Sequence, residues 1–396
     1  MSNPAEKTPA SSNQPPPPAP PSRLRRLGKK LLALLISTLI ALFIAEIAIR
    51  FLAPQVMVVP MTETLAGLQV QRPNVDGRGY VPRLYDVTYR TNSQRFRGQR
   101  EYPQQPTPGT TRIIAIGDSL CFGVGADDDQ SFPAVLEKSL QSANQKIEVI
   151  NAGIGGTGTG SQALWFDNSL SQLKPKIVVL SIFVNDIDDD FASPYFTLTS
   201  QNQAIPIAMY ERLKRVEQLE KARKRVNAIP GYSFLAEHSH LVNLIRRIAS
   251  RSMSGEKTAP KTAEQIQKQH DRFIAQGVPL FDAELAWLKE RVESAGCQLV
   301  IAWFPCRETI YPDTGAQADE FRWQANEIIK ALQSFSTKTK TPLLEPTNIF
   351  KQKAATSPTE LYYKGADWHP NPDGYRLFGE ELSTFLLKSG LLPNSK

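Results

Sequence analysis

The sequence predicts a three-layer α/β protein, in which helices cover both faces of a parallel, five-stranded sheet. Two observations predict it: five short, almost wholly apolar segments, and amphipathic helical patterns that alternate with them. Strands buried on both faces are apolar throughout, whereas half-exposed strands alternate apolar and polar residues. The alternation favours a flavodoxin-like strand order. The predicted strands are 112–117, 146–151, 176–184, 298–304 and 342–346.

The predicted helices lie between these strands and after the last one. They fall around 131–142, 160–171, 281–295, 318–335 and 373–388. The helical pattern of each has the apolar spacing of a helix that packs on a sheet.

Residues 188–280 break this rhythm and form an insertion between two strands. The insertion contains a charged helical stretch, Tyr210–Val226, then the turn Pro230-Gly231 and an amphipathic stretch, Phe234–Ile248. Because it lies between two strands, we expect it at one end of the sheet. We interpret it as a lid or substrate-binding element, and the alternative is a helical hairpin that never contacts substrate.

The first part of the chain predicts a membrane anchor. Residues 1–30 form a Pro-rich, basic tail, which cannot build a core and is predicted to be disordered. Residues 31–53 are apolar and would span roughly 34 Å as a helix, enough for a bilayer core of about 30 Å. Five cations precede them, so the positive-inside rule predicts a cytoplasmic N-terminus and an extracytoplasmic, periplasmic or cell-surface, catalytic part. A cleaved signal peptide is the alternative, although no small-x-small cleavage site follows convincingly.

The rest of the chain is predicted to be a connector, 54–110, with some short strands, followed by the main domain, 111–390.

The formal charge of +7 does not indicate a nucleic-acid partner, because most cations are interleaved with acids and no nucleic-acid motif is present. The chain has three cysteines, Cys121, Cys297 and Cys306. Their number and spacing predict neither a zinc site nor a disulfide framework.

A serine follows the first predicted strand, in Gly117-Asp118-Ser119-Leu120. In open α/β sheets, sites form at the carboxyl ends of strands, and the start of a helix there favours an oxyanion. Taken alone, the segment could equally be an ordinary helix N-cap. Ser119 is nevertheless a candidate nucleophile.

Two further segments follow the next two strands. The first, Asn151 to Gly156, is rich in glycine, which lets backbone amides approach a ligand closely, although it could also be a flexible turn. The second, Val184-Asn185-Asp186, offers an amide that can donate to a developing oxyanion, and its alternative is an Asx turn.

A candidate base precedes the last helix, in Asp367-Trp368-His369-Pro370-Asn371. Of the four histidines, His369 is the one with a carboxylate two residues away and a Pro-Asn turn after it. Asp367 could fix the histidine tautomer and stabilise the imidazolium. The pair His238 and His240 lacks a nearby third ligand, so no metal and no cofactor are predicted.

These four segments, in this order and each at a strand end, resemble the SGNH hydrolase superfamily, also called the GDSL family. The resemblance covers roughly residues 85–390 apart from the insertion, and Tyr89–Arg97 looks like bacterial membrane-tethered members. It implies that Ser119 is the nucleophile, Asp367 and His369 are the acid and base, and Gly156 and Asn185 donate to the oxyanion. The sequence departs from the family pattern in two places. The acid and base are spaced D-x-H instead of the commoner D-x-x-H, and Cys121 directly follows GDSL.

The sequence therefore predicts a serine esterase that acts on carbohydrate or lipid esters, deacetylation included, and works through an acyl-enzyme. The alternatives are an O-acyltransferase for an envelope polysaccharide and a catalytically silent envelope-binding protein. An α/β-hydrolase of the other common type would need a G-x-S-x-G elbow, which the chain lacks.

Overall fold

The computed structural model describes residues 23–143, 145–254, 262–312, 314–364 and 368–392, and the chain divides into two compact units at Pro54/Gln55. In the first unit, helix α1 (Arg23–Leu52) contains the largely apolar stretch Leu27–Leu52, within which the mean hydropathy over 18 residues reaches 2.6. Its length and composition suffice to cross a membrane, but a signal sequence would satisfy the same criteria. Most of the predicted tail, residues 1–22, lies outside the described residues.

The second unit is built on a five-stranded parallel sheet, which confirms the predicted fold class. The strand order is β12-β11-β8-β6-β7, the flavodoxin-like arrangement. The register pairs Ile113 with Ile177 and Leu180 with Ile301. The strands are β6 (Thr111–Ile116), β7 (Ile147–Asn151), β8 (Ile177–Ile182), β11 (Gln298–Trp303) and β12 (Leu343–Leu344).

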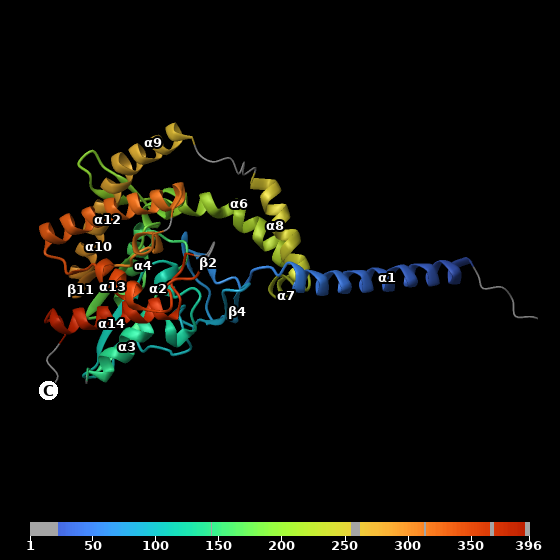
Figure 1. The fold of residues 1–396 in the computed structure, drawn as a ribbon, viewed down its shortest axis with the longest axis horizontal. Helices are drawn as coiled ribbons and strands as arrows, with labels where there is room; N and C mark the ends of the chain where they lie inside the picture. The colour runs from blue at the N-terminus through green and yellow to red at the C-terminus, as the bar shows by residue number, and fades with distance from the viewer. Residues whose placement is uncertain (1–22, 144, 255–261, 313, 365–367, 393–396) are drawn as a thin grey trace, which may run out of the picture. The chain divides into compact units, whose positions relative to one another are not determined.

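Helices cover both faces of this sheet (Figure 1). One face carries α3 (Phe132–Ser142) and α14 (Pro372–Lys388), which pack against each other. The other carries α4 (Thr159–Asn168), α10 (Val278–Ser294) and α12 (Ala316–Thr339). Shorter helices connect them: α2 (Ser119–Phe122), α5 (Asp186–Ala192), α11 (Arg307–Ile310), α13 (Thr347–Thr356), and the 3₁₀ turns Asp128–Gln130 and Leu170–Leu173.

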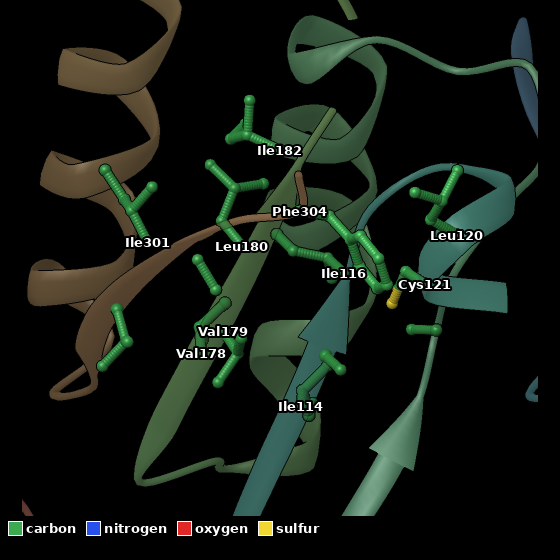
Figure 2. Close-up of a cluster of buried hydrophobic side chains, with 14 of the residues drawn as sticks. Ile114, Ile116, Leu120, Cys121, Val178, Val179, Leu180, Ile182, Ile301 and Phe304 are labelled. Atoms are coloured by element: carbon green, nitrogen blue, oxygen red, sulfur yellow. The ribbon is translucent and has the colours of Figure 1, made fainter. Parts of the chain in front are cut away.

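The core lies where the central strands meet these helices. Figure 2 shows Val178 and Leu180 on β8 and Ile114 on the neighbouring β6, and Cys121 belongs to the same buried cluster. Burial raises the pKa of the Cys121 thiol well above its usual range. Cys121 therefore acts here as a small apolar side chain, and all three thiols are buried and free of disulfides.

The connector folds into two small antiparallel sheets. One pairs β2 (Thr62–Leu65) with β3 (Leu68–Gln71). The other has the order β1-β4-β5 and consists of β1 (Met57–Val58), β4 (Asp76–Val81) and β5 (Tyr85–Arg90). These strands are short, and β3 brings polar side chains to the site described below.

The insertion contains a two-stranded ribbon and four helices among its described residues. They are β9 (Phe196–Leu198), β10 (Ala204–Pro206), α6 (Met209–Asn227), α7 (Tyr232–His238), α8 (His240–Ser254) and α9 (Ala263–Arg272), which continues through a π-turn, Phe273–Gly277, into α10. The amphipathic stretch predicted at 234–248 is two helices, because Ser239 adopts an extended backbone. The Ser239 hydroxyl accepts from Val242 N at 3.1 Å and so caps α8.

Candidate active site

Ser119 and His369 meet at the carboxyl edge of the sheet, although 250 residues separate them in sequence. His369 Nε2 lies 2.9 Å from Ser119 Oγ. Ser119 is the first residue of α2, directly after β6, and is only 9% exposed. A histidine nitrogen at hydrogen-bond distance from a serine hydroxyl is the arrangement that general-base activation of a nucleophile requires.

The turn that presents Ser119 is held by its two preceding residues. Asp118 caps α2, because its carboxylate accepts from Leu120 N at 2.8 Å. A side chain at Gly117 would lie 2.8 Å from the Cys121 Cβ and 2.9 Å from the Ser181 carbonyl oxygen. The close approach of backbone and neighbouring strand therefore requires glycine there.

The loop that carries His369 is fixed on both sides. The His369 carbonyl accepts from Tyr363 N at 3.1 Å. Two residues later, Asn371 caps α14 by accepting from Asp373 N at 3.0 Å. The Trp368 ring stacks on His369 at 4.6 Å between ring centroids and on Phe183 at 5.3 Å. This packing restricts the imidazole to few orientations.

The predicted acid, Asp367, lies outside the described residues, so its role stays a prediction. The described carboxyl close to the histidine is Asp118, which is fully buried. Burial raises the pKa of Asp118, while the Leu120 amide and the charge of His369 lower it. In the sequence, Asp118 is marked only by its position within Gly117-Asp118-Ser119-Leu120, where it was interpreted as a turn residue.

The glycine segment after β7 lies against the nucleophile. A Cβ at Gly155 would be 3.5 Å from the Ser119 Cβ, so the backbone passes at contact distance. Gly156 has φ +72°, a left-handed conformation that favours glycine. Among the described residues, neither the Ser119 amide nor the Gly156 amide donates a hydrogen bond within the protein. Both amides could therefore donate to an oxyanion.

Two glutamines of the connector hold this glycine segment. Gln69 Nε2 donates to Gly155 O at 2.7 Å, and Gln71 Nε2 donates to Gly153 O at 2.9 Å. Both glutamines come from β3, more than 80 residues earlier in the chain. Sequence reasoning missed them, because two glutamines in a connector carry no recognisable pattern.

Asn185 lies at the start of α5 and is partly buried. Its Nδ2 donates to Asp189 Oδ2 at 2.7 Å, and its Oδ1 has no partner among the described residues. Burial, followed by the negative charge of Asp118, raises the pKa of Asp189 to about 7. The Asn185 amide is thus engaged with a carboxyl group, and its predicted donation to an oxyanion would add a second acceptor.

Behind Asn185, buried carboxyl groups gather between α4, α5 and α10. Asp190 and Glu284 interact with each other, and Asp186 lies close to both. A Cβ at Gly158 would lie 2.5 Å from Asp190 Oδ1, so this glycine gives the carboxyl group its space. Burial raises the pKa of all three carboxyls, that of Asp190 to about 7.

A cavity of about 210 Å³ borders the glycine segment at Gly155. Its walls are mainly apolar and come from the connector and from the end of α2. They include Val59, Met61, Tyr85, Tyr89 and Phe122.

The described residues hold no group of three or more His, Cys, Asp or Glu arranged for a metal ion. His238 and His240, which the sequence analysis considered as a metal-binding pair, contact different residues. His240 Nδ1 accepts from Gln55 N at 2.9 Å, and the His238 ring stacks on Phe234.

The fold and the serine–histidine pair together define a three-layer α/β protein of the SGNH type. The chain belongs to the GDSL-like lipase/acylhydrolase family, whose family model matches residues 115–377. The matched range begins within β6 and ends within α14, so it contains Ser119, Gly156, Asn185 and His369.

Individual relatives are more distant. The chain is 31% identical over 75 residues to an arylesterase of Vibrio mimicus and 30% identical over 74 residues to the esterase TesA of Pseudomonas aeruginosa. These matches cover 19% of this chain and 38% and 37% of those proteins, so the chain spans less than two fifths of their length. A catalytic mutant of the acetylxylan esterase Axe2 of Geobacillus stearothermophilus has 15% identity and a TM-score of 0.39, covering 72% of this chain and 97% of that one.

Proposed function

We propose that this protein is a membrane-anchored serine esterase that cleaves carbohydrate or lipid esters through an acyl-enzyme. The observation that carries the proposal is the 2.9 Å contact between Ser119 Oγ and His369 Nε2 at the carboxyl edge of the sheet. Membership of the GDSL-like lipase/acylhydrolase family supports ester cleavage. The names of the two esterase relatives agree with it.

In the proposed reaction, His369 Nε2 takes the hydroxyl proton of Ser119 as Oγ attacks the ester carbonyl carbon. The tetrahedral intermediate collapses when the proton passes from His369 to the leaving alcohol oxygen, and the C–O ester bond breaks. Water then attacks the acyl-enzyme with His369 again as base, which releases the carboxylic acid and restores Ser119. Asp367 is the proposed partner that orients His369.

The negative charge that develops on the carbonyl oxygen needs donors. The amides of Ser119 and Gly156 are proposed for this role, because the protein does not use either within the described residues. The side chain of Asn185 is the third proposed donor. Loss of one such donor typically lowers kcat by about 10²–10³.

The apolar stretch Leu27–Leu52 supports a membrane location. The cations that precede it favour a cytoplasmic N-terminus and an extracytoplasmic catalytic unit. Retention of residues 31–53 in peptide maps of the mature, membrane-extracted protein would support the anchor. A mature chain that begins after residue 53 would contradict it.

Labelling of the detergent-solubilised full-length protein with a fluorophosphonate, followed by peptide mapping, tests the activated nucleophile without knowledge of the substrate. We expect one adduct, on Ser119, that is lost in Ser119→Ala and in His369→Ala. The matched control Ser142→Ala removes an exposed serine of α3 and should label normally. An adduct elsewhere, or none from a folded sample, would contradict the proposal.

A further inference from the structure

The insertion exposes large apolar side chains on three consecutive helices, α6, α7 and α8, which span Met209–Ser254 and are here called the docking helices. On α7, Phe234 is 64% exposed and Leu235 is exposed beside it. On α8, Ile245 is 56% exposed and lies one turn after the half-buried Leu241. Large apolar side chains that gather on a surface generally mark a binding site.

The same helices carry most of the net positive charge of the chain. Residues 209–254 contain ten Lys and Arg against four Asp and Glu, a net +6 of the total +7. Helix α8 holds three arginines and no acid, among them Arg246 and Arg247 directly after Ile245. Apolar side chains interleaved with cations on amphipathic helices are typical of segments that lie in the interface of an anionic bilayer.

The docking helices are tied to the residue that follows the apolar helix closely in sequence. Gln55 is the first residue of the second unit, and its amide donates to His240 Nδ1 at the start of α8, at 2.9 Å. The apolar helix α1 ends at Leu52. Only Ala53 and Pro54 therefore separate the apolar helix, in sequence, from the residue that binds the start of α8.

We propose that the docking helices bind the surface of an anionic lipid bilayer, with Phe234, Leu235 and Ile245 inserted between lipids and the arginines at the headgroups. The proposal rests on the proposed membrane anchor, residues 31–53, because the anchor brings this surface to the interface. It places the catalytic unit against the bilayer, where lipid-borne esters and envelope glycans are both within reach.

The test uses the full-length chain in lipid nanodiscs and a polarity-sensitive fluorophore on single introduced cysteines. The three native cysteines are buried, so labelling is directed to the new site. Probes go on Phe234→Cys and Ile245→Cys, and the reference is the near-isosteric Ser142→Cys on the exposed face of α3. We expect blue-shifted emission and quenching by spin-labelled lipids at the two insertion sites in nanodiscs that contain phosphatidylglycerol, and neither effect at the reference.

The charge contribution is tested separately by the double variant Arg225→Gln with Arg247→Gln. Removing two cations should lower the ratio of docked to undocked protein about 30-fold, at about 1 kcal/mol per cation near an anionic surface. The matched control, Lys351→Gln with Lys353→Gln on α13, makes the same change of charge elsewhere and should leave the ratio unchanged.

Three outcomes would overturn the proposal. They are emission at both insertion sites equal to that of the reference, docking that ignores lipid charge, and a spectral shift that depends on protein concentration, which would indicate a second copy as the partner. Ester hydrolysis of a soluble substrate by the same labelled proteins is measured in parallel. Failure of docking with intact hydrolysis is therefore distinct from failure of the proposed activity.

Discussion

Replacement of Asp190 by asparagine should stabilise the second unit at alkaline pH and have little effect at acidic pH. The Asp190 side chain is 3% exposed, and Gly160 N donates to its Oδ1 at 3.2 Å. Burial raises the pKa of Asp190 to about 7, while its interaction with Glu284 opposes the rise. In Asp190→Asn, the amide oxygen can still accept from Gly160 and the amide nitrogen can donate to Glu284.

The magnitude follows from the pKa in the two states. In the unfolded chain the carboxyl has a pKa of 3.8. Between about pH 4 and pH 7 the folded protein holds a proton that the unfolded chain has released, so the free energy of unfolding falls as the pH rises through this window. Above about pH 7 the carboxyl is ionised in both the folded and the unfolded state. The free energy of unfolding is then lower by the full cost of burying the charge, up to about 4 kcal/mol at 1.36 kcal/mol per pKa unit. We expect Asp190→Asn to raise the free energy of unfolding by about 1–4 kcal/mol at pH 8, a range that allows for the interaction of Asp190 with Glu284.

The assay is urea unfolding of residues 55–396, which form a compact unit with its own core. The free energy of unfolding is measured at pH 5 and pH 8 for the wild type, for Asp190→Asn and for the control Asp129→Asn, which makes the same substitution at an exposed site. The difference between Asp190→Asn and wild type should grow by at least about 1 kcal/mol from pH 5 to pH 8. An equal difference at both pH values, or a loss of stability at pH 8, would refute the reasoning.

Three further variants test the proposed site by steady-state hydrolysis of p-nitrophenyl acetate. Asn185→Ala should lower kcat by about 10²–10³ with little change in KM, because the oxyanion loses a donor; an unchanged kcat would remove Asn185 from that role. Gln69→Ala removes the 2.7 Å bond to Gly155 O and should lower kcat roughly tenfold by loosening the glycine segment, whereas Gln172→Ala at an exposed position should not. Trp368→Ala removes the ring stacked on His369 and should lower kcat while fluorophosphonate still labels Ser119, only more slowly.

The sheet could be predicted because its strands are fully buried. The four longer strands begin and end within two residues of the predicted bounds, since an uninterrupted apolar run stands out against amphipathic helices. The last strand is shorter than the predicted 342–346 and pairs only at Leu343–Leu344. A proline bounds this segment on each side, and a proline nitrogen cannot donate to the ladder.

The candidate pair, Ser119 and His369, could also be predicted, because each follows a recognisable turn and histidine is rare in the chain. The supporting groups could not. Gln69 and Gln71 act on carbonyls more than 80 residues away, so no local pattern marks them. The acidic segment Asp186–Asp190 has the composition of a solvated turn, yet Asp186 and Asp190 are almost fully buried.

These buried carboxyls explain how the start of α5 is held. Asp190 is near the end of this seven-residue helix, where its carboxylate accepts from Gly160 N on α4 and lies close to Glu284 on α10. Neither side-chain oxygen of Glu284 has a hydrogen-bond partner among the described residues, and Asn185 is the N-cap residue of α5. A protonated carboxyl can donate to an ionised one, so a shared proton would let Asp190 and Glu284 join three helices at neutral pH. Because α5 has only two turns, fixing its far end also fixes Asn185. The proposed oxyanion donor therefore depends for its position on groups that never contact the substrate.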